Sequence, residues 1–145
     1  PVPALAPGNT FLYTGRGEDD TLVIAEANHA RYQPLVVVAE QISPAALVAV
    51  YRRYYPLFQQ AYQELGYPDG YFNDRVIAVL DHLIAAEPVK GPIHLTRPNV
   101  LYRYADPALE ARSPGEKVLL RMGPDNAARV QAVLARWRAA LLAAE

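Results

Sequence analysis

The sequence predicts a mainly helical single domain, a multi-helix orthogonal bundle with a small β element. Two observations predict this class. The 145 residues are 52% apolar and 20% charged, which is the composition of a globular domain with a sizeable core. Several prolines follow a Ser, Asp or Gly that can cap a helix, a position where proline starts helices rather than breaking them. These prolines are Pro44, Pro107, Pro114 and Pro124.

The N-terminal region is predicted to hold two short strands. Residues 1–8 (PVPALAPG) are rich in proline and are interpreted as a linker remnant, which leaves residues 9–145 as the single helical domain. The strands are TFLYT (10–14) and TLVIA (21–25), and the polar, glycine-bearing stretch between them reads as a turn. Residues 26–42 are predicted to be helical in two pieces that meet near Pro34, with a strand at their valine run as the alternative.

Two helices form the predicted centre of the domain. The first runs from Pro44 to Leu65 and ends before Gly66, a residue type that readily adopts the left-handed conformation found after helices. The second is expected to start with Asn73 as its N-cap and to run to about Ala86. Because only the turn YPDGYF separates them, we expect an antiparallel helix pair.

The C-terminal half is predicted to contain one strand and several helices. NVLYRYA (99–105) alternates in polarity, as a strand with Tyr102 and Tyr104 on one face does. SPGE (113–116) is a capping-box sequence and marks a helix start. The expected helices cover residues 107–112, 114–122 and 124–143.

The stretch YRRYYPLFQQAYQELGYPDGYFNDR (51–75) is rich in aromatic rings. At 100° per residue, its helical rings fall with Leu47, Ala61 and Leu65 inside one arc of about 120°, opposite a polar face. We therefore expect the helical tyrosines to lie in the core with their hydroxyls at its rim, and keep a ligand-binding aromatic groove as the alternative. The rings in that arc are Tyr51, Tyr54, Tyr55, Phe58 and Tyr62.

Tyr67 and Tyr71 lie in the turn between the two helices, where rings have fewer neighbours. We interpret this turn, with the neighbouring strand, as a surface that binds a ligand or a partner. The alternative is that the two rings only close the end of the helix pair. The other residues assigned to this surface are Asn73, Asp74, Arg75, His82, Tyr102 and Tyr104.

No catalytic or cofactor signature is recognised in the sequence. The chain has no Cys, which excludes disulfides and thiolate chemistry. The histidines lack the spacing of a zinc motif and no glycine-rich nucleotide motif is present, so we expect neither a metal site nor a cofactor. The weak catalytic candidates, for acid and base roles in a hydrolase of cell-wall glycan, are Asp74, Asp81 and Glu64.

Charge and hydropathy argue against nucleic acid as a partner and against a membrane span inside this sequence. The formal net charge is −1 and the arginines are scattered, so no basic surface for nucleic acid or anionic lipid is expected. The longest apolar run, PLVVVA (34–39), is far too short to cross a bilayer. Membrane attachment is therefore expected only through a segment absent from this sequence.

Three stretches together resemble a bacterial family, the domain of unknown function 3014 family. They are ANHARYQPLV, YRRYYPLFQQAYQELGYPDGYFNDRVIAVLDHLI and RPNVLYRYADPALEARSPGEKVLLRMGP, and the resemblance extends over about residues 26–140. It implies a proteobacterial envelope protein with an N-terminal membrane helix and a proline-rich linker before this domain. We therefore expect a periplasmic or envelope location, with a cytoplasmic one as the alternative. The resemblance implies no activity, cofactor or catalytic residue.

These observations favour a non-catalytic periplasmic domain that binds an envelope protein or a glycan. The binding surface would be the Tyr67–Arg75 turn and the strand at 99–105, because amphipathic rings are in surplus there and no nucleophile or metal set is present. Two alternatives stay open. One is the glycan hydrolase with paired carboxylates, and the other is a structural module that self-associates through its aromatic face.

Overall fold

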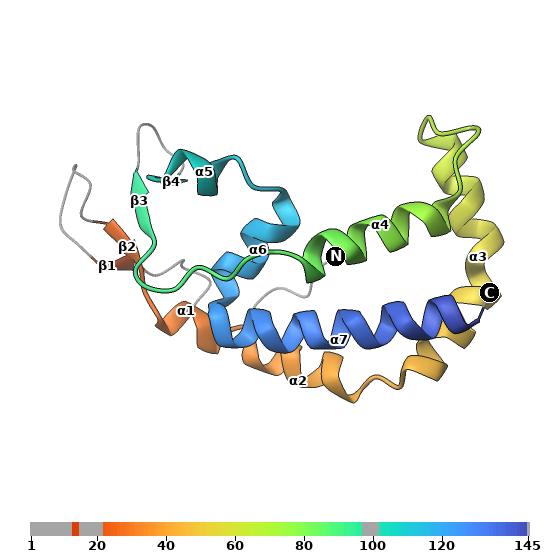
Figure 1. Ribbon diagram of the computed structural model, residues 1–145, viewed down its shortest axis with the longest axis horizontal. Helices are drawn as coiled ribbons and strands as arrows, with labels where there is room; N and C mark the ends of the chain where they lie inside the picture. Colours follow the sequence, from red (N-terminus) through yellow and green to blue (C-terminus); the bar gives the residue numbers. More distant parts are fainter. Residues whose placement is uncertain (1–12, 15–21, 97–101, 145) are drawn as a thin grey trace. The chain divides into compact units, whose positions relative to one another are not determined.

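The computed structural model describes residues 13–14, 22–96 and 102–144, and these residues form a mainly helical structure with a small antiparallel sheet (Figure 1). This confirms the predicted fold class. The helices are α1 Ala27–Ala30, α2 Gln33–Gln41, α3 Pro44–Glu64, α4 Phe72–Ile84, α5 Pro107–Glu110, α6 Pro114–Met122 and α7 Pro124–Ala143. The strands are β1 Tyr13–Thr14, β2 Leu22–Ile24, β3 His94–Thr96 and β4 Arg103–Tyr104.

Contacts within the chain divide it into two compact units. Unit 1 contains residues 1–36 and 87–128, and unit 2 contains residues 37–86 and 129–145. Each unit is therefore built from separate stretches of sequence, and the helices α2 and α7 contribute residues to both. The single domain expected over residues 9–145 stays a prediction.

Unit 1 is organised around the sheet, whose strand order is β1-β2-β3-β4 with every neighbouring pair antiparallel. Leu95 of β3 lies opposite Leu22 of β2 and Tyr104 of β4. The sequence prediction missed β3, because this strand has three residues and follows a proline-rich stretch. Residues 99–101 of the predicted last strand lie outside the described residues. The core of this unit contains Leu22, Ile24, Leu95, Tyr104, Leu109 and Leu120.

Most helix starts follow the predicted capping chemistry. The Ser43 side chain accepts a hydrogen bond from the Ala46 N–H, and the Asp106 side chain accepts one from the Ala108 N–H at 2.8 Å. The predicted capping box of Ser113 and Glu116 is present in full at the start of α6. These caps were predictable because each depends on residues at most three apart in the sequence.

The start of α4 differs from the prediction. The helix begins at Phe72 with Tyr71 in the N-cap position, and Asn73 lies inside the first turn. Side chains of α3 satisfy the first backbone donors instead: the Phe72 N–H donates to Gln59 Oε1 at 2.8 Å, and the Asn73 N–H donates to the Tyr55 hydroxyl at 3.4 Å. A tertiary cap therefore replaces the local one that Asn73 was expected to provide.

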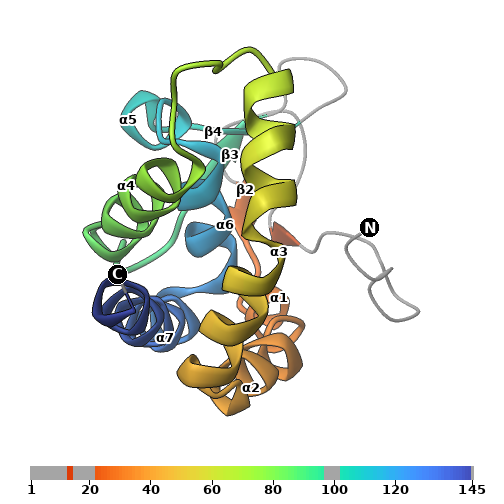
Figure 2. The same cartoon turned by 90° about the vertical axis from the view of Figure 1, so that its right-hand side faces the viewer.

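In unit 2, α4 contacts both α3 and α7, and its first residue, Phe72, packs on Tyr51 and Phe58 of α3. Figure 1 and Figure 2 both show α4 leaving α3 steeply, so the expected antiparallel pair is wrong. Gln131 of α7 donates through Nε2 to the carbonyls of Leu83, Ile84 and Ala86 at the end of α4. Arg138 of α7 pairs with Asp81. Gln131 therefore satisfies carbonyls at the C-terminal end of α4 that the helix itself leaves unpaired.

The expected burial of the α3 arc is only partly observed. Val48, which lies outside that arc, is the buried side chain of α3, while Tyr51, Tyr55 and Tyr62 are half-buried. Tyr54, Phe58, Ala61 and Leu65 are exposed, so the prediction that the helical rings lie mostly in the core is wrong for Tyr54 and Phe58. The prediction failed because a wheel shows which residues share a face and does not show which neighbour covers that face.

No single helix in the described part of the chain is long and apolar enough to cross a membrane. The segments Ala27–Gln41 and Pro44–Glu64 pass a length and composition test together, but they are bent by 83° at the break between them.

Candidate functional site

The turn between α3 and α4, here called the tyrosine turn (Leu65–Phe72), is held by side chains of α3. Gln59 Nε2 donates to the Gly70 carbonyl at 2.8 Å, and Gln59 Oε1 accepts from the Phe72 N–H at 2.8 Å. The Tyr55 hydroxyl donates to the same Gln59 Oε1 at 3.1 Å. One amide therefore fixes two backbone groups of the turn and is itself positioned by a tyrosine.

A second set of contacts supports the tip of the tyrosine turn. Tyr62 of α3 stacks on Tyr67 with ring centroids 4.6 Å apart and an interplanar angle of 8°. Gln63 Nε2 donates to the Pro68 carbonyl at 3.2 Å. A Cβ at Gly70 would lie 3.0 Å from Tyr62 Cε1, so a larger residue there would require the Tyr62 ring to shift.

The tyrosine turn displays apolar groups beside acidic ones. Tyr67 is 55% exposed and Tyr71 is 68% exposed, and Leu65 at the start of the turn is 77% exposed. The charged side chains in and beside the turn are also exposed, and they are Glu64, Asp69, Asp74 and Arg75. The surface is therefore a set of rings on a fixed backbone, with carboxylates in excess around them.

The structure brings only part of the predicted binding set together. Tyr67, Tyr71, Asp74 and Arg75 lie at the tyrosine turn or in the first turn of α4, and all are exposed. Asn73 lies there too, half-buried, and its Oδ1 accepts from the Tyr51 hydroxyl at 3.0 Å. His82 is exposed in the last turn of α4.

Tyr102 and Tyr104 belong to unit 1, and their proposed place on the binding surface needs correction. Tyr104 is 7% exposed in the core, where its hydroxyl donates to the Lys117 carbonyl at 3.3 Å. This burial raises the pKa of the Tyr104 phenol. Tyr102 is half-buried against the same core. The alternating pattern correctly put both rings on one face, but that face lies towards the core.

The carboxylates considered for catalysis are exposed. Glu64 accepts a hydrogen bond from Gln60 Nε2 at 2.8 Å, and Asp81 pairs with Arg138. Asp74 is exposed in the first turn of α4, where the positive end of the helix dipole favours an acid. The general acid of a glycosidase lies in an apolar pocket, whereas all three of these carboxylates are exposed. The geometry therefore gives the hydrolase alternative no support.

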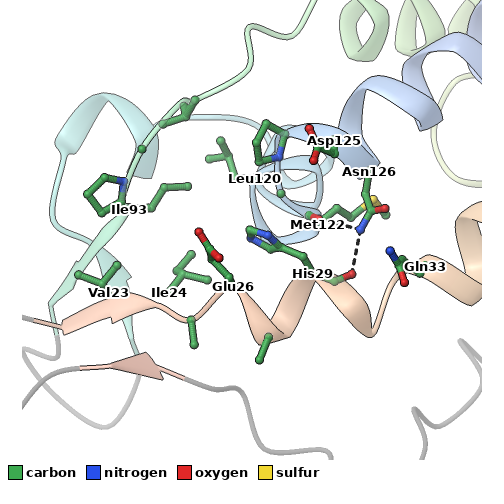
Figure 3. A pocket seen from close by; sticks show the side chains of 17 residues that line it. Val23, Ile24, Glu26, His29, Gln33, Ile93, Leu120, Met122, Asp125 and Asn126 are labelled. Carbon is green, nitrogen blue, oxygen red and sulfur yellow. Dashed lines mark hydrogen bonds between the residues drawn. The ribbon is translucent and has the colours of Figure 1, made fainter.

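Unit 1 contains a groove of about 840 Å³ that the sequence did not reveal (Figure 3). Its wall is made by the end of β2, α1, the segment before β3 and the junction of α6 with α7. Sequence reasoning missed it because these segments are distant in the chain and share no motif. Its apolar lining includes Val23, Ile24, Ile93, Leu120 and Met122, and its polar lining includes Glu26, His29, Gln33, Asp125 and Asn126.

The groove is closed at one end by contacts of α1 with the start of α7. Asn126 is buried, and its Nδ2 donates to the His29 carbonyl at 2.8 Å and to the Met122 carbonyl at 3.0 Å (Figure 3). The His29 ring lies against Gly123, where a Cβ would be 2.5 Å from Nδ1. The described residues contain no group of three or more His, Asp or Glu side chains that could hold a metal ion.

A comparison with protein families gives one match. The family model described as Protein of unknown function (DUF3014) matches residues 2–138. The matched range includes the tyrosine turn and all segments that line the groove. No curated protein and no solved structure matches the chain.

Proposed function

Because the chain belongs to the DUF3014 family, whose description assigns no activity, we propose its function from the site: a non-catalytic domain that binds a partner protein through the tyrosine turn. The main support is that Tyr67 and Tyr71 are exposed on a backbone that α3 side chains already fix. Large rigid rings are favoured anchors in protein interfaces, and a preformed turn loses little conformational entropy on binding.

The surroundings of the rings favour a protein with basic residues as the partner. Leu65 adds an exposed aliphatic group next to the rings, which fits an apolar pocket in a protein. The carboxylates of Asp69 and Asp74 flank the turn, and Arg75 is the neighbouring cation. Lys or Arg side chains around an apolar pocket would match both features of this surface.

We place this partner in the cell envelope as part of the proposal. The resemblance to envelope-anchored proteins supports that location. The hydrolase alternative is not carried further, because Asp81 is engaged by Arg138 and Glu64 by Gln60.

Site-specific photocrosslinking tests the proposed surface. A benzophenone amino acid replaces Tyr71 in the full-length protein, in cells that produce it, and the matched control carries it at Arg52, which is also exposed. We expect a discrete product with a second protein from position 71 and none from position 52. Tyr67→Ala should lower the yield from position 71 several-fold. Products at neither position, or equally at both, would contradict the proposal.

A glycan is tested as the competing occupant of the same rings. Purified cell-wall glycan is sedimented with the wild-type chain and with the Tyr67→Ala/Tyr71→Ala variant, and circular dichroism checks that both are folded. We expect no co-sedimentation of either chain. Co-sedimentation of the wild type that the double variant loses would replace the protein partner with a glycan.

A further inference from the structure

Helix α3 has a second apolar face beside the one that packs on α4. At the edge of this second face Phe58 contacts Phe72, with ring centroids 5.7 Å apart, and its last residue, Leu65, is also the first residue of the tyrosine turn. Taken at 100° per residue, the face spans an arc of about 100° and lies next to the buried Val48 and the half-buried Tyr51 and Tyr55. Leu57 is 61% exposed and Val50 is 57% exposed. We call this face the α3 stripe, and its residues, all exposed, are Val50, Tyr54, Leu57, Phe58, Ala61 and Leu65.

An exposed apolar stripe of this length needs an explanation. From Val50 to Leu65 it extends about 22 Å along the helix at a rise of 1.5 Å per residue. Scattered exposed apolar residues are normal, but a continuous face of this kind marks an interaction site.

We propose that the α3 stripe pairs with the same stripe of a second copy of this chain, with the two helices antiparallel. A twofold axis between positions 57 and 58 places Val50 opposite Leu65 of the second copy and Tyr54 opposite Ala61. Tyr54 then faces the small Ala61, and Leu57 faces Phe58 at the centre of the stripe. Leu65 belongs to both surfaces, so the self-association is tested at Leu57, which lies outside the tyrosine turn.

Charge complementarity favours this arrangement over a parallel one. Arg53 and Glu64 lie on the same flank of the α3 stripe, and both are exposed. A twofold axis perpendicular to the two helices places the same flank of each α3 stripe side by side. Arg53 then lies next to Glu64 of the second copy, with an offset of about 3 Å along the helix axis. In a parallel pair these charges would be about 16 Å apart along the axis. The antiparallel pairing forms this contact twice.

A second copy is the occupant that the charges favour. One twofold operator pairs Arg53 with Glu64 twice, whereas a different protein would need an independently matched surface. A single helix pair buries less than the roughly 1,200 Å² of a stable interface. We therefore expect a dimer with a dissociation constant in the micromolar range.

Sedimentation equilibrium of stripe variants tests the association. Leu57→Glu places a charge in the centre of the stripe at an exposed position, and we expect it to raise the dissociation constant at least tenfold. The matched control is Arg52→Glu, on the opposite face of α3, which should change it less than threefold. A wild-type monomer at millimolar concentration, or equal effects of both variants, would overturn the proposal.

Charge reversal and crosslinking test the orientation. Arg53→Glu and Glu64→Arg should each weaken the dimer, and the double variant should restore it. Because the chain has no Cys, single cysteines at Tyr54 and Ala61 give a clean readout. Mixed Tyr54→Cys and Ala61→Cys chains should form the heterologous disulfide, whereas dominant homologous disulfides would overturn the antiparallel pairing. Leu57→Glu leaves Leu65, the first residue of the tyrosine turn, unchanged, so crosslinking from position 71 should be unaffected by this variant.

Discussion

Gly123 is a residue whose backbone and surroundings both require glycine. Its φ of 82° and ψ of 161° lie in a region that essentially only glycine adopts, and a Cβ would be 2.5 Å from His29 Nδ1. We predict that Gly123→Ala lowers the free energy of unfolding by about 2–4 kcal/mol, from backbone strain and from overpacking together. Urea unfolding followed by circular dichroism measures this loss.

Gly91 offers the matched control for that prediction. Its φ is 97°, but a Cβ there would have no atom within 4 Å. Gly91→Ala should therefore show the backbone cost alone, about 1 kcal/mol. Equal losses for both variants would mean that the His29 contact contributes nothing.

Glu110 is the residue for which the structure gives a clear pH dependence. It accepts from the Tyr104 N–H at 3.0 Å and pairs with Lys117 at 3.0 Å, and these contacts lower its pKa below the ordinary value of 4.5. A lowered pKa stabilises the folded state above the unfolded pKa, and this contribution is lost as pH falls through the folded pKa. We predict that wild type is more stable than Glu110→Gln at pH 7 and that the difference shrinks towards pH 3. Urea unfolding at a series of pH values would show a constant difference if this assignment is wrong.

At the scale of elements, the amide of Gln59 is expected to determine whether the tyrosine turn is ordered. This amide donates to the Gly70 carbonyl and accepts from the Phe72 N–H, and both hydrogen bonds are partly buried. Gln59→Ala leaves both without their partner, so we predict a loss of about 1–3 kcal/mol in unfolding free energy and faster exchange of the Phe72 amide. Hydrogen exchange by NMR measures the second effect. Gln60→Ala, which removes only a surface hydrogen bond to Glu64, should leave both quantities nearly unchanged.

The elements also show what the sequence can predict. Helix starts at Pro44, Pro107 and Pro114 were correct because capping is local chemistry. The cap of α4, the direction of α4 and the burial of the α3 arc were wrong, because each depends on a neighbour distant in sequence. The exposure of Tyr67 and Tyr71 was expected because they lie in a turn. The groove in unit 1 could be found only from the structure, because segments distant in the sequence line it.

At the scale of the whole molecule, the chain passes between the two units at residues 36–37, 86–87 and 128–129. Two of these passages lie inside helices, α2 and α7. If one unit unfolded alone, helices α2 and α7 would each lose the part of their length that lies in that unit. Because a helix end without partners is costly, we expect the two units to unfold together as one cooperative domain.

The chain's one Trp makes this expectation testable across the units. Trp137 lies in unit 2 with its indole nitrogen buried, whereas Gly123 lies in unit 1. We predict that Gly123→Ala shifts the Trp137 fluorescence transition in urea by the same amount as the circular dichroism transition, because destabilising one unit destabilises both. If the units instead unfold independently, the Trp137 midpoint stays in place while part of the circular dichroism change moves to lower urea. That outcome would replace the predicted single domain with two, joined by helices that fray at their shared ends.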